Sequence, residues 1–136
     1  MAIDENKTIV RDFFARNDRE KKIPEEMCAP GFTAYLPGQP PMDLEAFKKV
    51  VASYAAFSDY HNTVEDMVAE GDKVAFRFER QATHTGEFMG VPASGKQVSW
   101  MTIGIVRLAN GKIVEFWNSP DRMGMLQQVG VLPAPE

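Results

Sequence analysis

Asp121 has the most suggestive position among the side chains that could do chemistry. It follows a β-rich segment that ends at Pro120 and comes directly before a short helical segment that reaches Gly130. A carboxylate at such a joint could remove a proton from a carbon atom as a general base. Aspartate is also a favoured helix N-cap, worth about 1 kcal/mol through hydrogen bonds to free backbone amides. The local sequence leaves both interpretations open.

His84 is the second candidate for acid/base work. It ends one face of the β-rich segment 73–85, where apolar side chains recur at every second position. That face carries Val74, Phe76, Phe78, Ala82 and His84. An imidazole at its end could donate a hydrogen bond to a carbonyl or enolate oxygen. A buried histidine satisfied by a backbone carbonyl would give the same pattern. His61 is interpreted as structural or exposed.

Six aromatic residues could line a site for a flat ligand. Trp100 and Trp117 could form one wall, and four others could extend it or donate hydroxyl groups: Phe76, Phe78, Tyr54 and Tyr35. Each of them could equally be an ordinary core, interface or half-buried residue, because aromatic side chains dominate such surfaces without any ligand.

Two other kinds of site are excluded by the pattern. Residues 90–96 nearly match a phosphate-binding loop, but Gln97 replaces the hydroxyl that would hold magnesium, and a strand follows where a helix should start. The two histidines lie 23 positions apart, and with the single Cys28 they form no known metal-ligand spacing. We therefore expect no metal and no cofactor.

The composition narrows the partners and the compartment. A net charge of −4 and a pI near 5.2 argue against nucleic acid or an anionic membrane as partner. The longest apolar runs are far shorter than the ~20 residues that span a bilayer. A single cysteine and a polar start without a signal-peptide core lead us to expect a cytoplasmic protein. The length fits one domain, residues 1–136.

The chain is expected to form helices first and hairpins afterwards. Apolar spacing predicts helices over about residues 5–17 and 44–54, the second capped by Asp43. Pro24 should start a short helical turn that ends at Pro30, before a short strand. The strands are predicted as follows: 32–36, 60–70, 73–85, 97–108 and 112–118. Asn110-Gly111 suits a tight hairpin turn. The fold class is therefore α+β, with helices on one face of a curved, mostly antiparallel sheet.

The segment 97–108 is apolar on both of its faces. One face carries Val98, Trp100, Thr102 and Val106, and the other carries Met101, Ile103 and Ile105. Helices on one side of the sheet would leave the second set exposed. We expect this outer face to be buried in a homodimer. In the last strand, simple alternation places Ile113, Glu115, Trp117 and Ser119 on one side.

Three blocks of the chain together resemble the SnoaL-like polyketide cyclase family. They are residues 83–92 followed by Gly95-Lys96, the strand 111–117, and Asp121 followed by residues 127–130. The family belongs to the nuclear transport factor 2-like (cystatin-like) superfamily. The resemblance implies a cone-shaped barrel, with helices packed in the concave face of the sheet and a pocket at its wide end. One departure is Pro92-Ala93-Ser94, where the family usually has Pro-Pro-Thr.

The resemblance also implies an activity. Family members with known chemistry close a ring by an intramolecular aldol reaction on a polyketide ester, without metal or cofactor. Transferred to this chain, Asp121 would be the acid/base residue, and His84 and Trp117 would lie near the pocket. The ligand would be a small apolar or aromatic carbonyl compound, cyclised, isomerised or dehydrated. The alternatives are a non-catalytic binding or carrier protein with the same pocket, and an adaptor that binds another protein through its outer face.

Overall fold

The N-terminal helix sets the first layer of the structure. In the computed structural model, which describes residues 2–133, α1 (Ala2–Glu20) buries one side of its length. The apolar residues on that side are Val10, Phe13 and Phe14, and Asn17 follows them one turn later, only 4% exposed. The predicted helix is confirmed, and it extends beyond both of its expected ends.

Five strands form an open, curved mixed sheet with the order β1-β5-β4-β3-β2. Their bounds are β1 Cys28–Tyr35, β2 His61–Glu70, β3 Lys73–Thr83, β4 Gln97–Ala109 and β5 Lys112–Pro120. The pairs β2·β3, β3·β4 and β4·β5 are antiparallel, and β1 joins β5 in parallel. The mostly antiparallel sheet is confirmed. The turn between β4 and β5 uses Asn110 and Gly111 at φ 52° and 78°, as a tight hairpin requires.

Short helices connect and close this sheet. The 3-10 helix η1 (Glu25–Met27) is the turn that follows Pro24. It ends before Cys28, where β1 already begins, so the expected end of the turn at Pro30 was wrong. The second helix, α2 (Leu44–Ala52), starts at Asp43, whose side chain accepts a hydrogen bond from the Ala46 amide at 2.9 Å. The 3-10 helix η2 (Ser53–Phe57) continues it, and α3 (Arg122–Gln128) follows β5.

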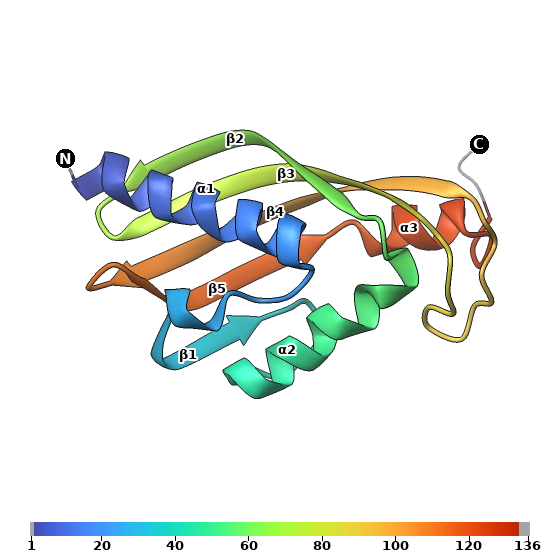
Figure 1. Ribbon diagram of the computed structural model, residues 1–136, viewed down its shortest axis with the longest axis horizontal. Coiled ribbons are helices and arrows are strands. Elements are labelled where there is room, and N and C mark those ends of the chain that lie inside the picture. Colours follow the sequence, from blue (N-terminus) through green and yellow to red (C-terminus); the bar gives the residue numbers. More distant parts are fainter. Residues whose placement is uncertain (1, 134–136) are drawn as a thin grey trace.

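The helices α1 and α2 lie on the same face of the sheet, while α3 lies beyond the end of β5 (Figure 1). The main core fills the space between the two helices and the concave face, with a cluster of phenylalanine rings at its centre. The centroids of Phe14 and Phe76 lie 4.8 Å apart, and those of Phe47 and Phe116 lie 5.3 Å apart. A second core, around Phe57, lies toward α3 and includes Met125. The α+β fold with helices in the concave face of a curved sheet is thus confirmed, although the sheet does not close into a barrel.

The two faces of β4 separate as predicted. Val98, Trp100, Thr102 and Val106 point into the core, whereas Met101, Ile103 and Ile105 are 38%, 55% and 44% exposed.

The alternation predicted for β5 was wrong at its start. A register shift pairs Leu108 with Ile113 but Arg107 with Glu115, so Val114 forms a bulge. Ile113 therefore faces the core, while Trp117 faces outward beside Ile105.

Candidate functional site

A narrow cavity lies between α1, α2 and the concave face of the sheet. Aromatic side chains make up much of its wall, including Phe14, Tyr54, Phe78, Trp100 and Phe116. The cavity volume is about 50 Å³, which is room for a few water molecules. Four residues also line a shallower surface groove of about 240 Å³ and therefore mark the mouth of the cavity. These four residues are Leu36, Val50, Tyr54 and Arg122.

The polar side of the cavity contains Arg80, which β3 places among apolar neighbours. Its guanidinium lies 4.2 Å from the ring centroid of Tyr60 and 5.5 Å from that of Phe78, both cation–π distances. No carboxylate of the described residues lies within ion-pair distance of it. Burial lowers the pKa of Arg80, because removing water disfavours the charged form. An arginine still keeps its proton at neutral pH.

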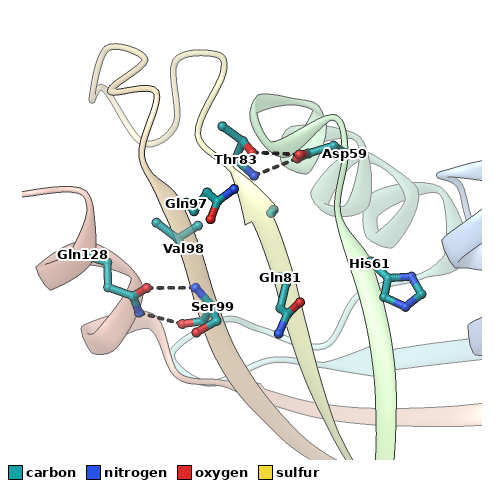
Figure 2. Close-up of a pocket in the computed structure, with 9 residues that line it drawn as sticks. Asp59, His61, Gln81, Thr83, Gln97, Val98, Ser99 and Gln128 are labelled. Atoms are coloured by element: carbon teal, nitrogen blue, oxygen red, sulfur yellow. Dashed lines mark hydrogen bonds between the residues drawn. The ribbon is translucent and has the colours of Figure 1, made fainter.

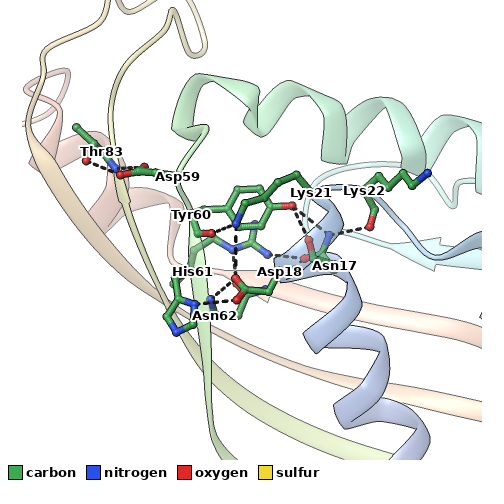
Figure 3. Close-up of polar contacts among 10 residues, drawn as sticks. Asn17, Asp18, Lys21, Lys22, Asp59, Tyr60, His61, Asn62 and Thr83 are labelled. Carbon is green, nitrogen blue, oxygen red and sulfur yellow. Dashed lines mark hydrogen bonds and ion pairs between the residues drawn. The ribbon is translucent and has the colours of Figure 1, made fainter.

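Asparagine side chains hold this guanidinium in place. Arg80 Nε donates to Asn62 Oδ1 at 2.6 Å, and Nη2 donates to Asn17 Oδ1 at 3.3 Å. Asn17 in turn donates to the Tyr60 hydroxyl at 3.2 Å and to the Lys22 carbonyl at 3.2 Å. Figure 3 shows that Asn17, Tyr60 and Asn62 converge from the end of α1 and the start of β2. The network fixes the position of a cation without neutralising it.

Asp18 anchors the outer side of the same network. Its Oδ1 accepts a hydrogen bond from the Asn62 amide at 2.8 Å, and its Oδ2 lies 2.7 Å from His61 Nδ1 (Figure 3). His61 itself is exposed, as expected, and belongs to this surface cluster rather than to the cavity.

Asn118 adds an unsatisfied acceptor to the cavity wall. Its register position opposite Gly104 turns its side chain inward, and it lines the cavity together with Arg80 and Thr102. The Oδ1 atom of Asn118 is buried and has no hydrogen-bond partner among the described residues. Buried polar atoms nearly always have a partner, so an orphaned acceptor in a cavity wall is suited to a donor from a ligand or a water molecule.

Asp121 lies beside the mouth of this cavity and caps α3. Its Oδ1 accepts a hydrogen bond from the Gly124 amide at 2.9 Å, and its own amide donates to the Met101 carbonyl. Pairing with the outward-facing Met101 turns its side chain outward, where it is exposed. Its two neighbours, Pro120 and Arg122, line the cavity, but Asp121 does not. Its Oδ2 makes no hydrogen bond within residues 2–133.

His84 is fully buried, but in the second core rather than in the cavity wall. Its Nδ1 lies 2.9 Å from Ser94 Oγ and 3.3 Å from the Ser94 amide, which donates to it. Nδ1 is thus an acceptor, so Nε2 carries the proton, and Nε2 has no partner among the described residues. The imidazole ring stacks on the ring of Phe57, with the two ring centroids 5.3 Å apart. The structure therefore does not bring Asp121 and His84 together in one cavity.

The six aromatic candidates separate into three groups. Tyr54, Phe78 and Trp100 line the cavity, and Phe76 lies in the main core next to it. Tyr35 and Trp117 stack on the outer face, with ring centroids 3.9 Å apart and an interplanar angle of 8°. The expected wall of two tryptophans does not form, because Trp100 and Trp117 point to opposite faces of the sheet.

A second, more polar depression lies at the far end of β3 and β4 (Figure 2). Most of its polar side chains already bond to the protein. Asp59 accepts hydrogen bonds from the amide and the hydroxyl of Thr83 at 2.7 and 2.8 Å, and these bonds lower its pKa. Gln128 bonds to both backbone groups of Ser99. We interpret these hydrogen bonds as structural contacts that attach η2 and α3 to the end of the sheet.

The polar residues of the cavity were missed by sequence reasoning, although signals for them exist. Arg80 occupies the same strand face as Phe78 and Ala82, and Asn17 follows Phe13 at helical spacing. A polar residue inside an apolar periodic pattern is such a signal. Asn118 could not be assigned to a face without the bulge in β5.

None of the helices within residues 2–133 has both the length and the apolarity that a membrane crossing needs.

Comparison with known proteins agrees with the fold. The model of a family described as SnoaL-like polyketide cyclase matches residues 7–129. Aklanonic acid methyl ester cyclase DnrD from Streptomyces peucetius is 30% identical over 95 residues, which cover 68% of this chain and 66% of DnrD. The match thus spans slightly less than two thirds of that relative.

Two solved structures are also similar. AclR from Streptomyces galilaeus, proposed to be a hydroxylase, has a TM-score of 0.89 at 29% identity, over 98% of this chain and 90% of AclR. IdmH from Streptomyces antibioticus, proposed to be a polyketide cyclase, has a TM-score of 0.79 at 32% identity, over 93% of this chain and 99% of IdmH. Proteins with this architecture have thus been assigned different reactions.

Proposed function

Since the chain belongs to the SnoaL-like polyketide cyclase family, we propose that it binds a small, largely apolar carbonyl compound in the inner cavity and closes a ring by cofactor-free acid/base chemistry. The observation that carries this proposal is the cavity itself, an aromatic wall that also contains one half-buried cation and one unsatisfied acceptor. Ligand pockets typically combine an apolar lining with a few placed polar groups. A ligand that contains a ring exceeds the present volume, so binding requires the mouth at Leu36, Tyr54 and Arg122 to widen.

Asp121 is the proposed base of this reaction. Its position between two cavity-lining residues and its uncommitted Oδ2 support this role. In the proposed step, Asp121 takes a proton from the carbon next to a carbonyl, and the electron pair moves onto the carbonyl oxygen. The enolate carbon then forms a bond to a ketone carbon, and the new alkoxide takes the proton back from Asp121. Because Asp121 faces outward in the closed structure, this step requires its carboxylate to turn toward the mouth.

The second candidate is a binding protein that uses the same cavity without chemistry. The exposure of Asp121 and its hydrogen bond to Gly124 favour it, because a capping carboxylate explains the residue completely. His84 contributes to catalysis in neither arrangement unless the loop that holds Ser94 moves.

The test compares turnover and binding in matched variants. Aklanonic acid methyl ester, the compound in the name of the relative DnrD, is the first substrate to try. The Asp121→Asn variant keeps a capping side chain but cannot accept a proton, so we expect turnover to fall by about 10²–10⁴-fold with binding retained. Asp43→Asn is the control, because Asp43 is also an exposed helix cap and does not line the cavity. Full turnover in Asp121→Asn would refute the base, and binding without turnover in the unaltered protein would favour the carrier.

We further propose that the protein is a homodimer through the outer sheet face. Met101, Ile103, Ile105 and Trp117 form an exposed apolar patch there, and such patches on one face mark interaction surfaces. Light scattering should give twice the chain mass for the unaltered protein and one chain mass for Ile103→Lys. A monomer before substitution would refute the dimer and leave the adaptor as the explanation of this face.

A further inference from the structure

Arg80 is an unusual group for an aromatic cavity wall. Arg80 is half-buried, and an ion that is withdrawn from water normally has an oppositely charged partner, because desolvating a charge is costly. Here only asparagine oxygens and aromatic rings surround the guanidinium, and the described residues place no carboxylate within ion-pair distance. Asp18, the nearest acidic side chain in the network, bonds to Asn62 and His61 instead. The cavity wall therefore carries a positive charge without a carboxylate in direct contact, and Asp18 acts on it only from beyond ion-pair distance.

Arg80 also has N–H groups that are left for a ligand. A guanidinium has five N–H groups. One from Nε and one from Nη2 are used, on Asn62 and Asn17. No hydrogen bond from Nη1 occurs within residues 2–133, and Arg80 lines the cavity. Unused donors in a largely aromatic cavity wall are suited to an oxygen of the ligand, and a positive charge makes an oxygen that becomes negative the best match.

Asn118 narrows the class of ligand further. Its orphaned Oδ1 lines the same cavity and needs a donor. An enol or a phenol can present a negative oxygen to Arg80 together with a neighbouring hydroxyl that donates to Asn118. The aromatic walls formed by Tyr54, Phe78 and Trp100 suit a flat, conjugated ligand.

Resting on the function proposed above, we propose that Arg80 binds the oxyanion of an enolate or phenolate in this cavity. In the ring closure, Arg80 donates to the carbonyl oxygen that receives the electron pair when Asp121 removes the carbon-bound proton. It is a catalytic residue in this scheme, because it touches the reacting oxygen, whereas Asn17 and Asn62 are positioning residues that hold it.

The test uses 2-naphthol, whose ionised form is a flat aromatic oxyanion, and 2-methoxynaphthalene, which has a similar shape but cannot ionise. The absorption spectrum of 2-naphthol reports its ionisation directly while it is bound. A phenol has an ordinary pKa of about 10. A dry apolar cavity alone would raise this pKa, and only a nearby cation or strong donors would lower it. The sign of the shift therefore separates the two environments.

In the unaltered protein we expect the pKa of bound 2-naphthol to fall by at least one unit, which means that the anion binds at least about tenfold more tightly than the neutral form. In Arg80→Met the pKa should rise above its ordinary value. Arg77→Met is the matched control, because Arg77 lies on the outer face of the same strand, and it should leave the shift unchanged. The affinity for 2-methoxynaphthalene and the thermal midpoint show whether each variant is folded.

The outcomes separate the two proposals. If 2-methoxynaphthalene binds but the pKa of 2-naphthol is raised or unchanged in the unaltered protein, the inference about Arg80 is overturned and the binding function stands. That result needs no variant, so it decides even if Arg80→Met does not fold. An equal lowering in the unaltered protein and in folded Arg80→Met also overturns it. If neither compound binds the unaltered protein, the proposed function fails and the inference fails with it.

Discussion

Removing the N-cap of α3 should lower the free energy of unfolding by a predictable amount, because a single side chain, that of Asp121, caps the start of this helix. Asp121 Oδ1 bonds to the Gly124 amide at 2.9 Å, and the seven-residue helix that follows packs Met125 into the second core. Asp121→Ala loses this hydrogen bond and should cost about 1 kcal/mol, whereas Asp121→Asn should cost a few tenths at most, since asparagine caps nearly as well. For a domain of this length, 1 kcal/mol corresponds to roughly 3–5 °C in the thermal midpoint.

The assay is thermal and urea unfolding of the unaltered protein and the two Asp121 variants, followed by circular dichroism. Asp43→Ala supplies the comparison, because Asp43 caps α2 through the Ala46 amide at the same distance and should lose a similar free energy. Equal losses in Asp121→Ala and Asp121→Asn would refute the capping explanation. No loss in Asp121→Ala would show that α3 is held by its core contacts alone.

Three further predictions concern stability. Gly104→Ala should lower the free energy of unfolding by about 1–3 kcal/mol, as measured by urea unfolding. The reason is that an added Cβ would lie 2.1 Å from the Trp117 carbonyl oxygen and 2.5 Å from the Phe76 ring. An unchanged urea midpoint would contradict this close approach. The hydrogen bonds from Thr83 lower the pKa of Asp59 below its ordinary 3.8, so their stabilisation is present above that pH and is lost as the pH falls through the folded-state pKa. The stability difference between the unaltered protein and Asp59→Ala should therefore shrink below pH 4, and a constant difference would refute the linkage. Burial raises the pKa of Cys28 from 9.0 to about 11, so stability should decline between these two pH values, and Cys28→Ala should remove that decline in unfolding measured at pH 8–11.

The sequence predicted the elements well because their patterns are local. Asp43 followed by a one-sided apolar segment gave the start of α2 correctly, and Asn110-Gly111 gave the hairpin between β4 and β5. Neither feature depends on distant residues. The parallel pairing of β1 with β5 is different, because it joins Ala34 to Phe116 across most of the chain and leaves no local signal.

The candidate site was less predictable, because it depends on which way single side chains point. The bulge at Val114 reverses the alternation of β5, and it decides that Trp117 faces outward and Asn118 inward. A bulge is a tertiary adjustment that alternation cannot anticipate. The inward position of Arg80 could have been predicted, since Arg80 interrupts an apolar strand face. It was missed because apolar side chains dominate that face. His84 was correctly placed on the buried face and still lies outside the cavity, because a strand face extends beyond one pocket.

The location of the ligand tests the account most directly, and the two tryptophans of the chain report it. Trp100 lines the inner cavity and Trp117 lies on the outer face. In a nitrogen-labelled sample, each indole N–H gives its own resonance, which Trp117→Phe assigns. Titration with 2-naphthol should move the Trp100 resonance in a saturable way and leave that of Trp117 in place. A saturable shift of Trp117 alone would place the ligand on the outer face and contradict the proposed cavity function.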